Sequence, residues 1–596
     1  MASQYGLYDE MVMNITPSHF FISSSAQTIS ISRTDCSIQV VKQSQNTPDP
    51  KRIYGILGII ELARGPYLVV VKSRKEVGLM DGNKIWKVGS TEIHALYTEH
   101  EAAAVTLTQA EDDKKYLALV KQILALPLYF SYDFDITNTY QRRAAWTREK
   151  ALEPLYKKVD VRFWWNRFLL SPFLHPVASA VDGTPSAAPE QFARFILPVM
   201  MGFIEIHHLN VKGTLIEFAL FSRRHTRRAG CRYVVRGIDA SGAVANFVET
   251  EQVIVEPTRK LTHSFVQIRG SIPIFWTQLA TLKYAPRIAI QTKQDVDAAF
   301  NAHFGELSSI YGRDGPFVCT SLINLKGSEL KLAEQYAAVV QRNREWQPGV
   351  EYYPFDFHKE CPGTNYTALQ RLLGEIQPSM EKIGWFIADN AQHGEGPSFR
   401  SGSVLRAQSG AVRVNCIDNL DRTNVGQSVF AKHVLLQQLQ ILGLISADTK
   451  LEDLVELKKA FQNTWADNAN SIATQYAGTA ALKVDFTRTG KRSLQGMLAD
   501  GYNSLMRYML NNFKDGVKQD AFNLFLGVYR VDPRARSPFA LDKGREQLIN
   551  FFLVLFVLLF GAGFTRVITF NPYVTAGYWV AFIGIYAAGI TLYGKK

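Results

Sequence analysis

Cysteine is scarce in this chain of 596 residues, and its copies have no C-x-x-C spacing. The five are Cys36, Cys231, Cys319, Cys361 and Cys416. Structural zinc sites and disulfide frameworks need paired or regularly spaced cysteines, so this scarcity argues against both and indicates a reducing compartment. We expect no metal site and no cofactor.

Secretion signals are also missing from the N-terminus. Its first residues, MASQYGLYDEMVMNITPS, lack the basic start and apolar core of a signal peptide. Positive charge, in contrast, is in surplus, because 66 Lys and Arg against 54 Asp and Glu give a net charge of +12. This surplus favours an anionic partner such as nucleic acid, an acidic membrane surface or a phosphorylated substrate.

Polar side chains are nearly absent from two segments near the C-terminus. Asn550 is the only one in LINFFLVLFVLLFGAGF (548–564), and VTAGYWVAFIGIYAAGITLY (574–593) is a second apolar stretch. At about 1.5 Å per residue they span roughly 25 and 30 Å, which predicts transmembrane helices at 548–565 and 573–593. Basic residues gather at the two outer ends of this hairpin, which predicts that both termini are cytosolic.

The N-terminal third has the pattern of an antiparallel β-structure. Residues 53–122 alternate runs rich in Val, Ile and Tyr with Gly-Pro and Asp-Gly turns. The segment HPVASAVDGTPSAAP (175–189) has few large apolar side chains and reads as a boundary. We therefore predict a β-rich domain over residues 1–180.

Strands and helices alternate over residues 190–515, which predicts an α/β domain and makes the protein a multidomain α+β and α/β chain. FIEIHHLNV and TLIEFALFS read as strands, TALQRLLGEIQPSMEKIGWFIA as a helix, and NREWQPGVEYYPFDFH as a loop. Residues 516–547 are predicted to be a cytosolic tether that ends in the basic, proline-containing segment VDPRARSPFALDKGREQ.

The candidate for chemistry is CIDNLDR, residues 416–422, in which five residues separate a cysteine from an arginine. SGAVRVN before it predicts a strand, and TNVGQSVFAKHVLLQQLQIL after it predicts a helix. In that context backbone N–H groups and the helix N-terminus bind an anion and favour a thiolate, the nucleophilic form of cysteine. Cys416 is therefore the candidate nucleophile, and Arg422 offers a planar fork to phosphate oxygens. The other expected phosphate-binding positions of the loop are Ile417, Asn419, Leu420 and Thr423.

Two aspartates in this loop would repel a phosphate, so they need a role of their own. An alkyl-type leaving group such as an inositol oxygen needs a proton when it departs. Nearby negative charge raises the pKa of a carboxyl group, which lets the group hold that proton. Asp421 is the first choice as general acid, and as base for the water that releases the phosphate. Asp418 is the alternative acid, or a contact for a substrate hydroxyl.

CIDNLDRTN resembles the CX5R(T) motif of the Sac-domain phosphoinositide phosphatases. Four further stretches are similar to that family: RRHTRRAGCRYVVRGIDASGAVANFVETEQ (223–252), SFVQIRGSIPIFWTQ (264–278), YYPFDFHKEC (352–361) and WADNANSIATQYAGTAALKVDFTRTGKR (465–492). The resemblance covers roughly residues 50–510. The C-terminal hairpin resembles the integral-membrane members of the endoplasmic reticulum and Golgi.

The resemblance implies a β-rich Sac N-terminal domain followed by a catalytic domain of the cysteine-phosphatase type. It implies metal-independent hydrolysis of phosphatidylinositol monophosphates, chiefly the 4-phosphate and also the 3-phosphate, at an anionic membrane surface and without a nucleic-acid partner. The implied location is the endoplasmic reticulum membrane, with the Golgi as an alternative. Two other functions stay open, a membrane-tethered protein-tyrosine phosphatase and an inactive phosphoinositide-binding scaffold.

Basic residues in two of these motifs are further candidates for binding the inositol phosphate or anionic lipid, although basic runs are also typical of solvated surface. They are Arg224, Arg228, Lys483, Arg488, Lys491 and Arg492.

Overall fold

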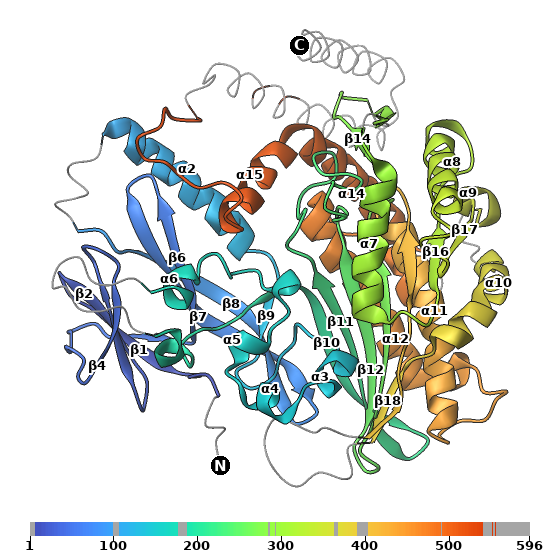
Figure 1. The fold of residues 1–596 in the computed structure, drawn as a ribbon, viewed down its shortest axis with the longest axis horizontal. Coiled ribbons are helices and arrows are strands. Elements are labelled where there is room, and N and C mark those ends of the chain that lie inside the picture. The colour runs from blue at the N-terminus through green and yellow to red at the C-terminus, as the bar shows by residue number, and fades with distance from the viewer. Residues whose placement is uncertain are drawn as a thin grey trace.

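The computed structural model combines a small antiparallel sheet, a large mixed sheet and covering helices (Figure 1). It describes residues 6–98, 106–176, 188–283, 286–292, 294–362, 367–389, 403–489 and 492–539, together with Phe551 and Leu555. The mixed α/β character expected from the sequence is confirmed.

The N-terminal part begins with a five-stranded sheet in the order β4-β3-β2-β1-β5. Its strands are β1 (Met11–Ile15), β2 (His19–Ser23), β3 (Thr28–Ser32), β4 (Ile38–Val41) and β5 (Lys51–Ile53). Three long antiparallel strands follow, β6 (Gly55–Leu62), β7 (Gly65–Met80) and β8 (Asn83–Ala95). The antiparallel strands predicted from residue 53 onwards are therefore confirmed.

A 13-stranded sheet runs from this part into the second one. Eleven of its strands follow the order β17-β16-β20-β13-β12-β11-β10-β9-β8-β7-β6, while β18 pairs with β13 and β19 pairs with β18. Its remaining strands are β9 (Leu128–Phe130), β10 (Met200–Val211), β11 (Thr214–Arg224), β12 (Val248–Glu256), β13 (Leu261–Arg269), β16 (Phe317–Ser321), β17 (Val350–Pro354), β18 (Phe386–Asp389), β19 (Ser403–Arg406) and β20 (Ala411–Asn415). A separate ribbon pairs β14 (Trp276–Gln278) with β15 (Ile288–Ile290). β17 lies in a segment predicted as a loop, because its parallel pairing with β16 is a long-range contact that local composition does not signal.

Helices cover both ends of the large sheet (Figure 1). The long ones are α2 (Leu107–Leu124), α7 (Val296–Tyr311), α8 (Gly327–Arg342), α10 (Ala368–Ile383), α11 (Asp421–Ile441), α12 (Val455–Ala477), α14 (Leu494–Phe513) and α15 (Asp515–Phe525). The short ones are α3 (Tyr140–Ala144), α4 (Arg148–Leu152), α5 (Leu155–Lys158), α6 (Ser171–Leu174), α9 (Phe357–Glu360) and α13 (Val484–Thr489), with 3-10 turns at Val161–Phe163, Pro189–Phe192 and Leu451–Asp453. The predicted helix at 367–383 is confirmed as α10.

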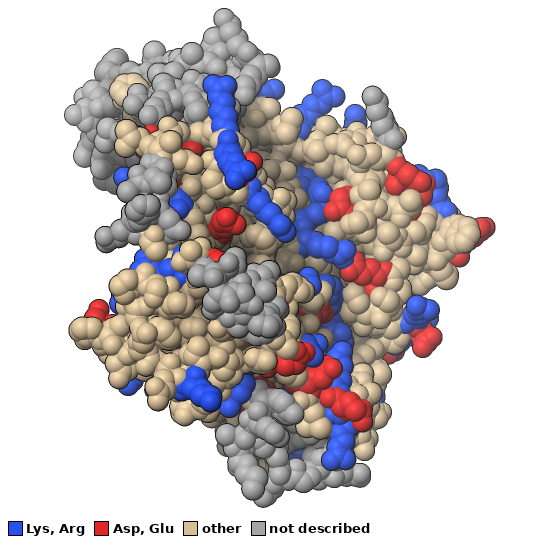
Figure 2. Space-filling view, turned by 60° about the vertical axis from the view of Figure 1, so that its left-hand side comes forward, with Lys and Arg blue, Asp and Glu red and all other residues tan. Residues whose placement is uncertain are grey.

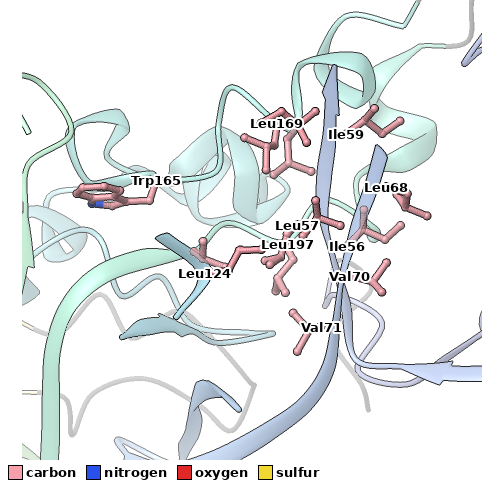
Figure 3. Close-up of a cluster of buried hydrophobic side chains, with 14 of the residues drawn as sticks. Ile56, Leu57, Ile59, Leu68, Val70, Val71, Leu124, Trp165, Leu169 and Leu197 are labelled. Atoms are coloured by element: carbon pink, nitrogen blue, oxygen red, sulfur yellow. The ribbon is translucent and has the colours of Figure 1, made fainter. Parts of the chain in front are cut away.

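The predicted tether is in part a packed helix. Phe522 and Phe525 of α15 are fully buried in the N-terminal core, where the ring of Phe522 lies 5.8 Å from that of Trp165. Figure 3 shows Trp165 and the aliphatic side chains of β6 and β7 in the same core. The chain after α15 then follows α2, and Ser537 donates a hydrogen bond to Asp112 at 2.8 Å. The helix is buried because its apolar face packs against the core of the N-terminal part.

The predicted membrane spans, 548–565 and 573–593, lie outside the described residues except for Phe551 and Leu555. Among the residues that the structure describes, no helix is both long enough and apolar enough to cross a bilayer. The longest, α11 and α12, have 21 and 23 residues but carry charged and amide side chains, whereas a span needs about 20 mostly apolar residues. This finding contradicts the predicted multi-pass location in the endoplasmic reticulum or Golgi membrane with both termini cytosolic, and we correct that prediction.

Asn166 holds the N-terminal core together through four buried hydrogen bonds. Its amide donates to the carbonyls of Leu57 and Leu197 at 2.9 Å, and its oxygen accepts from Trp164 Nε1 and the Val199 N–H at 3.0 Å. A buried polar group that loses its partner costs about 1–3 kcal/mol.

We therefore predict that Asn166→Ala lowers the apparent Tm by several degrees, through a loss of roughly 3–5 kcal/mol of unfolding free energy. Scanning calorimetry measures the shift. The adjacent exposed Arg167→Ala is the control and should leave Tm within about 1 °C. An unchanged Tm for Asn166→Ala would contradict this account of the core.

Candidate active site

The candidate loop lies at the carboxyl end of an interior strand of the large sheet. β20 pairs in parallel with β13 on one side and β16 on the other, and all its residues are buried. Cys416 follows β20 directly, and Asp421 is the first residue of α11. The predicted strand, loop and helix are therefore confirmed, and they bring the amino end of a 21-residue helix close to the thiol, where negative charge is stabilised.

Cys416 lines a cavity of about 240 Å³, although the residue is only 2% exposed. Cationic and acidic side chains share the cavity wall: Arg232, Arg422, Lys483 and Arg507, with Asp418 and Asp421. Figure 2 shows Lys and Arg side chains gathered along a hollow on one face of the molecule. Four cations against two carboxylates leave the cavity with a positive surplus that suits a phosphate dianion.

Asp418 is clamped by two arginines. Arg232 pairs with its Oδ2 at 2.8 Å, and Arg236 pairs with its Oδ1 at 2.7 Å while donating to the Ile417 carbonyl at 2.9 Å. Burial alone would raise the pKa of Asp418, but the two guanidinium groups outweigh it and hold that pKa well below its usual range. The raised carboxyl pKa expected for the acid is not found at Asp418, which stays ionised and fixes the loop.

Asp421 has a different environment at the start of α11. Its Oδ1 accepts the Leu482 N–H at 2.7 Å, and its Oδ2 pairs with Arg507 at 3.1 Å. Arg507 comes from α14 and also donates to Thr479 Oγ1 at 3.1 Å and to the Ala480 carbonyl at 2.9 Å. Arg507 of α14 and the backbone of Leu482 therefore hold Asp421 in place.

The Arg422 guanidinium is engaged by a carboxylate rather than open to solvent. Its two terminal nitrogens donate to the two oxygens of Glu329 at 3.2 and 3.3 Å, and one also donates to the Leu322 carbonyl at 3.0 Å. Burial opposes the charged form, but the negative charges of Cys416 and Glu329 outweigh it and raise the pKa of Arg422. Arg422 thus carries its charge beside the thiol, and a bound phosphate would compete with Glu329 for it.

The remaining predicted loop residues present little side chain to the cavity. Asn419, Leu420 and Thr423 are at most 2% exposed, so their contacts with a bound phosphate would come from the backbone. Asn419 adopts a positive φ of 55°, a conformation that asparagine tolerates better than most residues. The carbonyl of Ile417 is already bound to Arg236.

Of the predicted basic residues outside the loop, only Lys483 lines the cavity in the described part of the chain. Arg488 pairs with Asp467, and Arg492 bridges Asp485 and Asp500. These two arginines hold α13 and its neighbours in place. Lys491 lies outside the described residues.

Two further predicted arginines, Arg224 at the end of β11 and Arg228 shortly after it, make structural contacts instead of lining the cavity. Arg224 is 1% exposed, lies over the Phe522 ring at 4.7 Å and donates to the Gly230 carbonyl at 2.8 Å. Arg228 donates to the carbonyl of Arg236. Neither lines the cavity.

Two arginines near the thiol, Arg507 and Arg269, are not among the site residues predicted from the sequence. Arg507 lies 85 positions after Arg422, with no motif to connect them. Arg269 is fully buried, and its Nε and Nη1 have no hydrogen-bond partner in the described structure. Burial lowers the pKa of Arg269 to about 10, and the nearby negative charge of Cys416 works in the opposite direction. The only local signal for Arg269 was its place in the SFVQIRGSIPIFWTQ motif.

Comparison with known proteins connects this geometry to one family. The SacI homology domain matches residues 54–362. The chain is 38% identical over 539 residues to phosphatidylinositol-3-phosphatase SAC1-B of Danio rerio, covering 89% of this chain and 86% of that protein. It is 35% identical to phosphatidylinositol-3-phosphatase SAC1 of Drosophila melanogaster, covering 99% and 96%, and 34% identical to phosphoinositide phosphatase SAC6 of Arabidopsis thaliana, covering 96% and 91%. The chain therefore belongs to the SacI homology domain family, as these phosphoinositide phosphatases do.

Proposed function

We propose that this protein hydrolyses phosphatidylinositol monophosphates, chiefly the 4-phosphate and also the 3-phosphate, to phosphatidylinositol and inorganic phosphate. Its family makes it a phosphatidylinositol-phosphate phosphatase. The observation that carries the mechanism is the position of Cys416 in a cationic cavity at the β20–α11 loop.

The Cys416 thiolate attacks the phosphorus in line with the inositol oxygen, forming a sulfur–phosphorus bond as the oxygen–phosphorus bond breaks. Arg422 leaves Glu329 and binds two oxygens of the phosphoryl group, so its fork follows their charge into the transition state. Arg232 and Lys483 add positive charge at the cavity wall. Water then attacks the cysteinyl phosphate and releases inorganic phosphate.

Asp421 is the general acid of this mechanism, and Asp418 is a positioning residue. The departing inositol oxygen takes a proton from Asp421, which later accepts one from the attacking water. Asp418 is unsuited to that task because its two arginines keep its pKa well below the usual range. Its ion pairs instead set the shape of the loop that carries Cys416.

We predict that Cys416→Ser abolishes phosphate release from short-chain phosphatidylinositol 4-phosphate, because a serine hydroxyl is not ionised near neutral pH. The rate of the wild-type protein should persist in EDTA, since every proposed group is a side chain. The matched control is Cys36→Ser in the N-terminal part, which should keep full activity.

Turnover retained by Cys416→Ser would contradict the mechanism. A wild-type protein that prefers a phosphotyrosine peptide would instead be the protein-tyrosine phosphatase, and one that binds the lipid without turnover would be the inactive scaffold.

We further predict that Asp421→Asn lowers kcat by about 10²–10⁴ and removes the general-acid limb from the pH profile of kcat. Asp418→Asn should also lose activity, because Arg232 and Arg236 lose their anchor, but it should keep that limb. Steady-state rates between pH 4 and 9 distinguish the two variants. A limb that survives in Asp421→Asn and disappears in Asp418→Asn would reverse the assignment.

A further inference from the structure

The first half of α14 carries an exposed apolar stripe. Leu494, Met497, Leu498 and Tyr502 are 70%, 50%, 53% and 64% exposed. Their spacing of three and four residues places them on one face of the helix, which is the pattern of a helix face that is normally buried. Adjacent exposed apolar side chains of this kind mark an interaction surface rather than ordinary solvated surface.

The stripe is continuous with the active-site cavity. Ser504, Arg507 and Tyr508 of the same helix line that cavity. With 100° per residue, these three lie on a face of α14 adjacent to the stripe, and Leu498 is about 14 Å along the axis from Arg507. Whatever covers the stripe therefore also lies beside the mouth of the cavity.

The charge around the stripe suits an anionic surface. Asp500 is the only acidic residue of α14, and Arg492 pairs with its Oδ2 at 2.7 Å. Its Oδ1 accepts the Lys483 N–H at 2.9 Å. Arg492 also pairs with Asp485, so the two carboxylates beside the start of α14 share one arginine, and the positive surplus lies in the adjoining cavity. An anionic bilayer offers both an apolar interior for the stripe and negative headgroups for this cavity.

We propose that the stripe formed by Leu494, Met497, Leu498 and Tyr502 docks into an anionic lipid bilayer and seats the cavity over the headgroup of its substrate. This inference rests on the proposed function, because a lipid headgroup reaches the thiol only where the cavity faces a bilayer. Apolar side chains beside a basic site provide the two attractions that hold a protein at a membrane interface.

The test compares full-length wild type with Leu498→Glu/Tyr502→Glu on two forms of phosphatidylinositol 4-phosphate. One form is short-chain and dissolved, and the other is embedded in vesicles of phosphatidylcholine and phosphatidylserine. Because two apolar side chains are replaced by charges, we expect turnover on vesicles to fall about tenfold or more. Turnover of the dissolved substrate should stay within about twofold. Val455→Glu is the matched control, since Val455 is 73% exposed at the far end of α12, and it should change neither rate.

A second measurement reports on the helix itself. Hydrogen–deuterium exchange of wild-type residues 494–505 should slow when vesicles lacking substrate are added, and it should not slow in the double variant. Equal turnover of wild type and variant on vesicles, or unchanged exchange in α14, would overturn the proposal. A parallel loss on dissolved substrate would also overturn it, because the stripe would then act on the cavity rather than on the membrane.

Two further outcomes identify other causes. If the wild type forms a dimer that the double variant lacks, and exchange in α14 is unaffected by vesicles, a second copy covers the stripe and the proposal fails. If the wild type hydrolyses neither substrate while its α14 is still protected by vesicles, the proposed function fails but the docking surface stands.

Discussion

The ion pairs of Asp418 with Arg232 and Arg236 are the interaction on which the shape of the candidate active site depends. An unpaired carboxylate between Cys416 and Arg422 would repel the phosphate dianion that this loop is proposed to bind. Two guanidinium groups cancel that charge, and Arg236 also binds the carbonyl of Ile417. The carboxylate thus anchors the loop, because the arginines attach the β20–α11 connection to the segment that follows β11.

The same principle of paired charge recurs around the thiol. Arg422 pairs with Glu329, and Arg507 pairs with Asp421. Without substrate, Glu329 and Asp421 offset the positive charges of these two arginines. The pairing matters because an unpaired charge is costly in a protein interior. In the proposed mechanism a phosphate replaces Glu329 as the partner of Arg422, so substrate binding exchanges one ion pair for another. Arg269 is also buried, and its positive charge lies near the thiol of Cys416.

The parts of the fold with strong local patterns could be predicted from the sequence. The strand before Cys416, the helix after it and the antiparallel strands from residue 53 all have apolar periodicity within a single segment. The parallel strand β17 and the burial of α15 could not, because they depend on surfaces from distant parts of the chain. The same limit applies to Arg224, which is buried in the core, and to Arg507, which lines the cavity. A basic side chain reads alike in sequence whether it lies in the core, on the surface or in the cavity.

In the proposed mechanism, Cys416 carries the phosphoryl group between substrate and water. The most direct test of this step is to mix the protein with short-chain phosphatidylinositol 4-phosphate, quench with acid within milliseconds, digest and analyse the peptides by mass spectrometry. We predict one added phosphoryl group on the peptide containing residues 413–422, attached to Cys416 and lost on longer incubation. Phosphate release at full rate with this peptide never modified, or a phosphoryl group trapped on another residue, would contradict it.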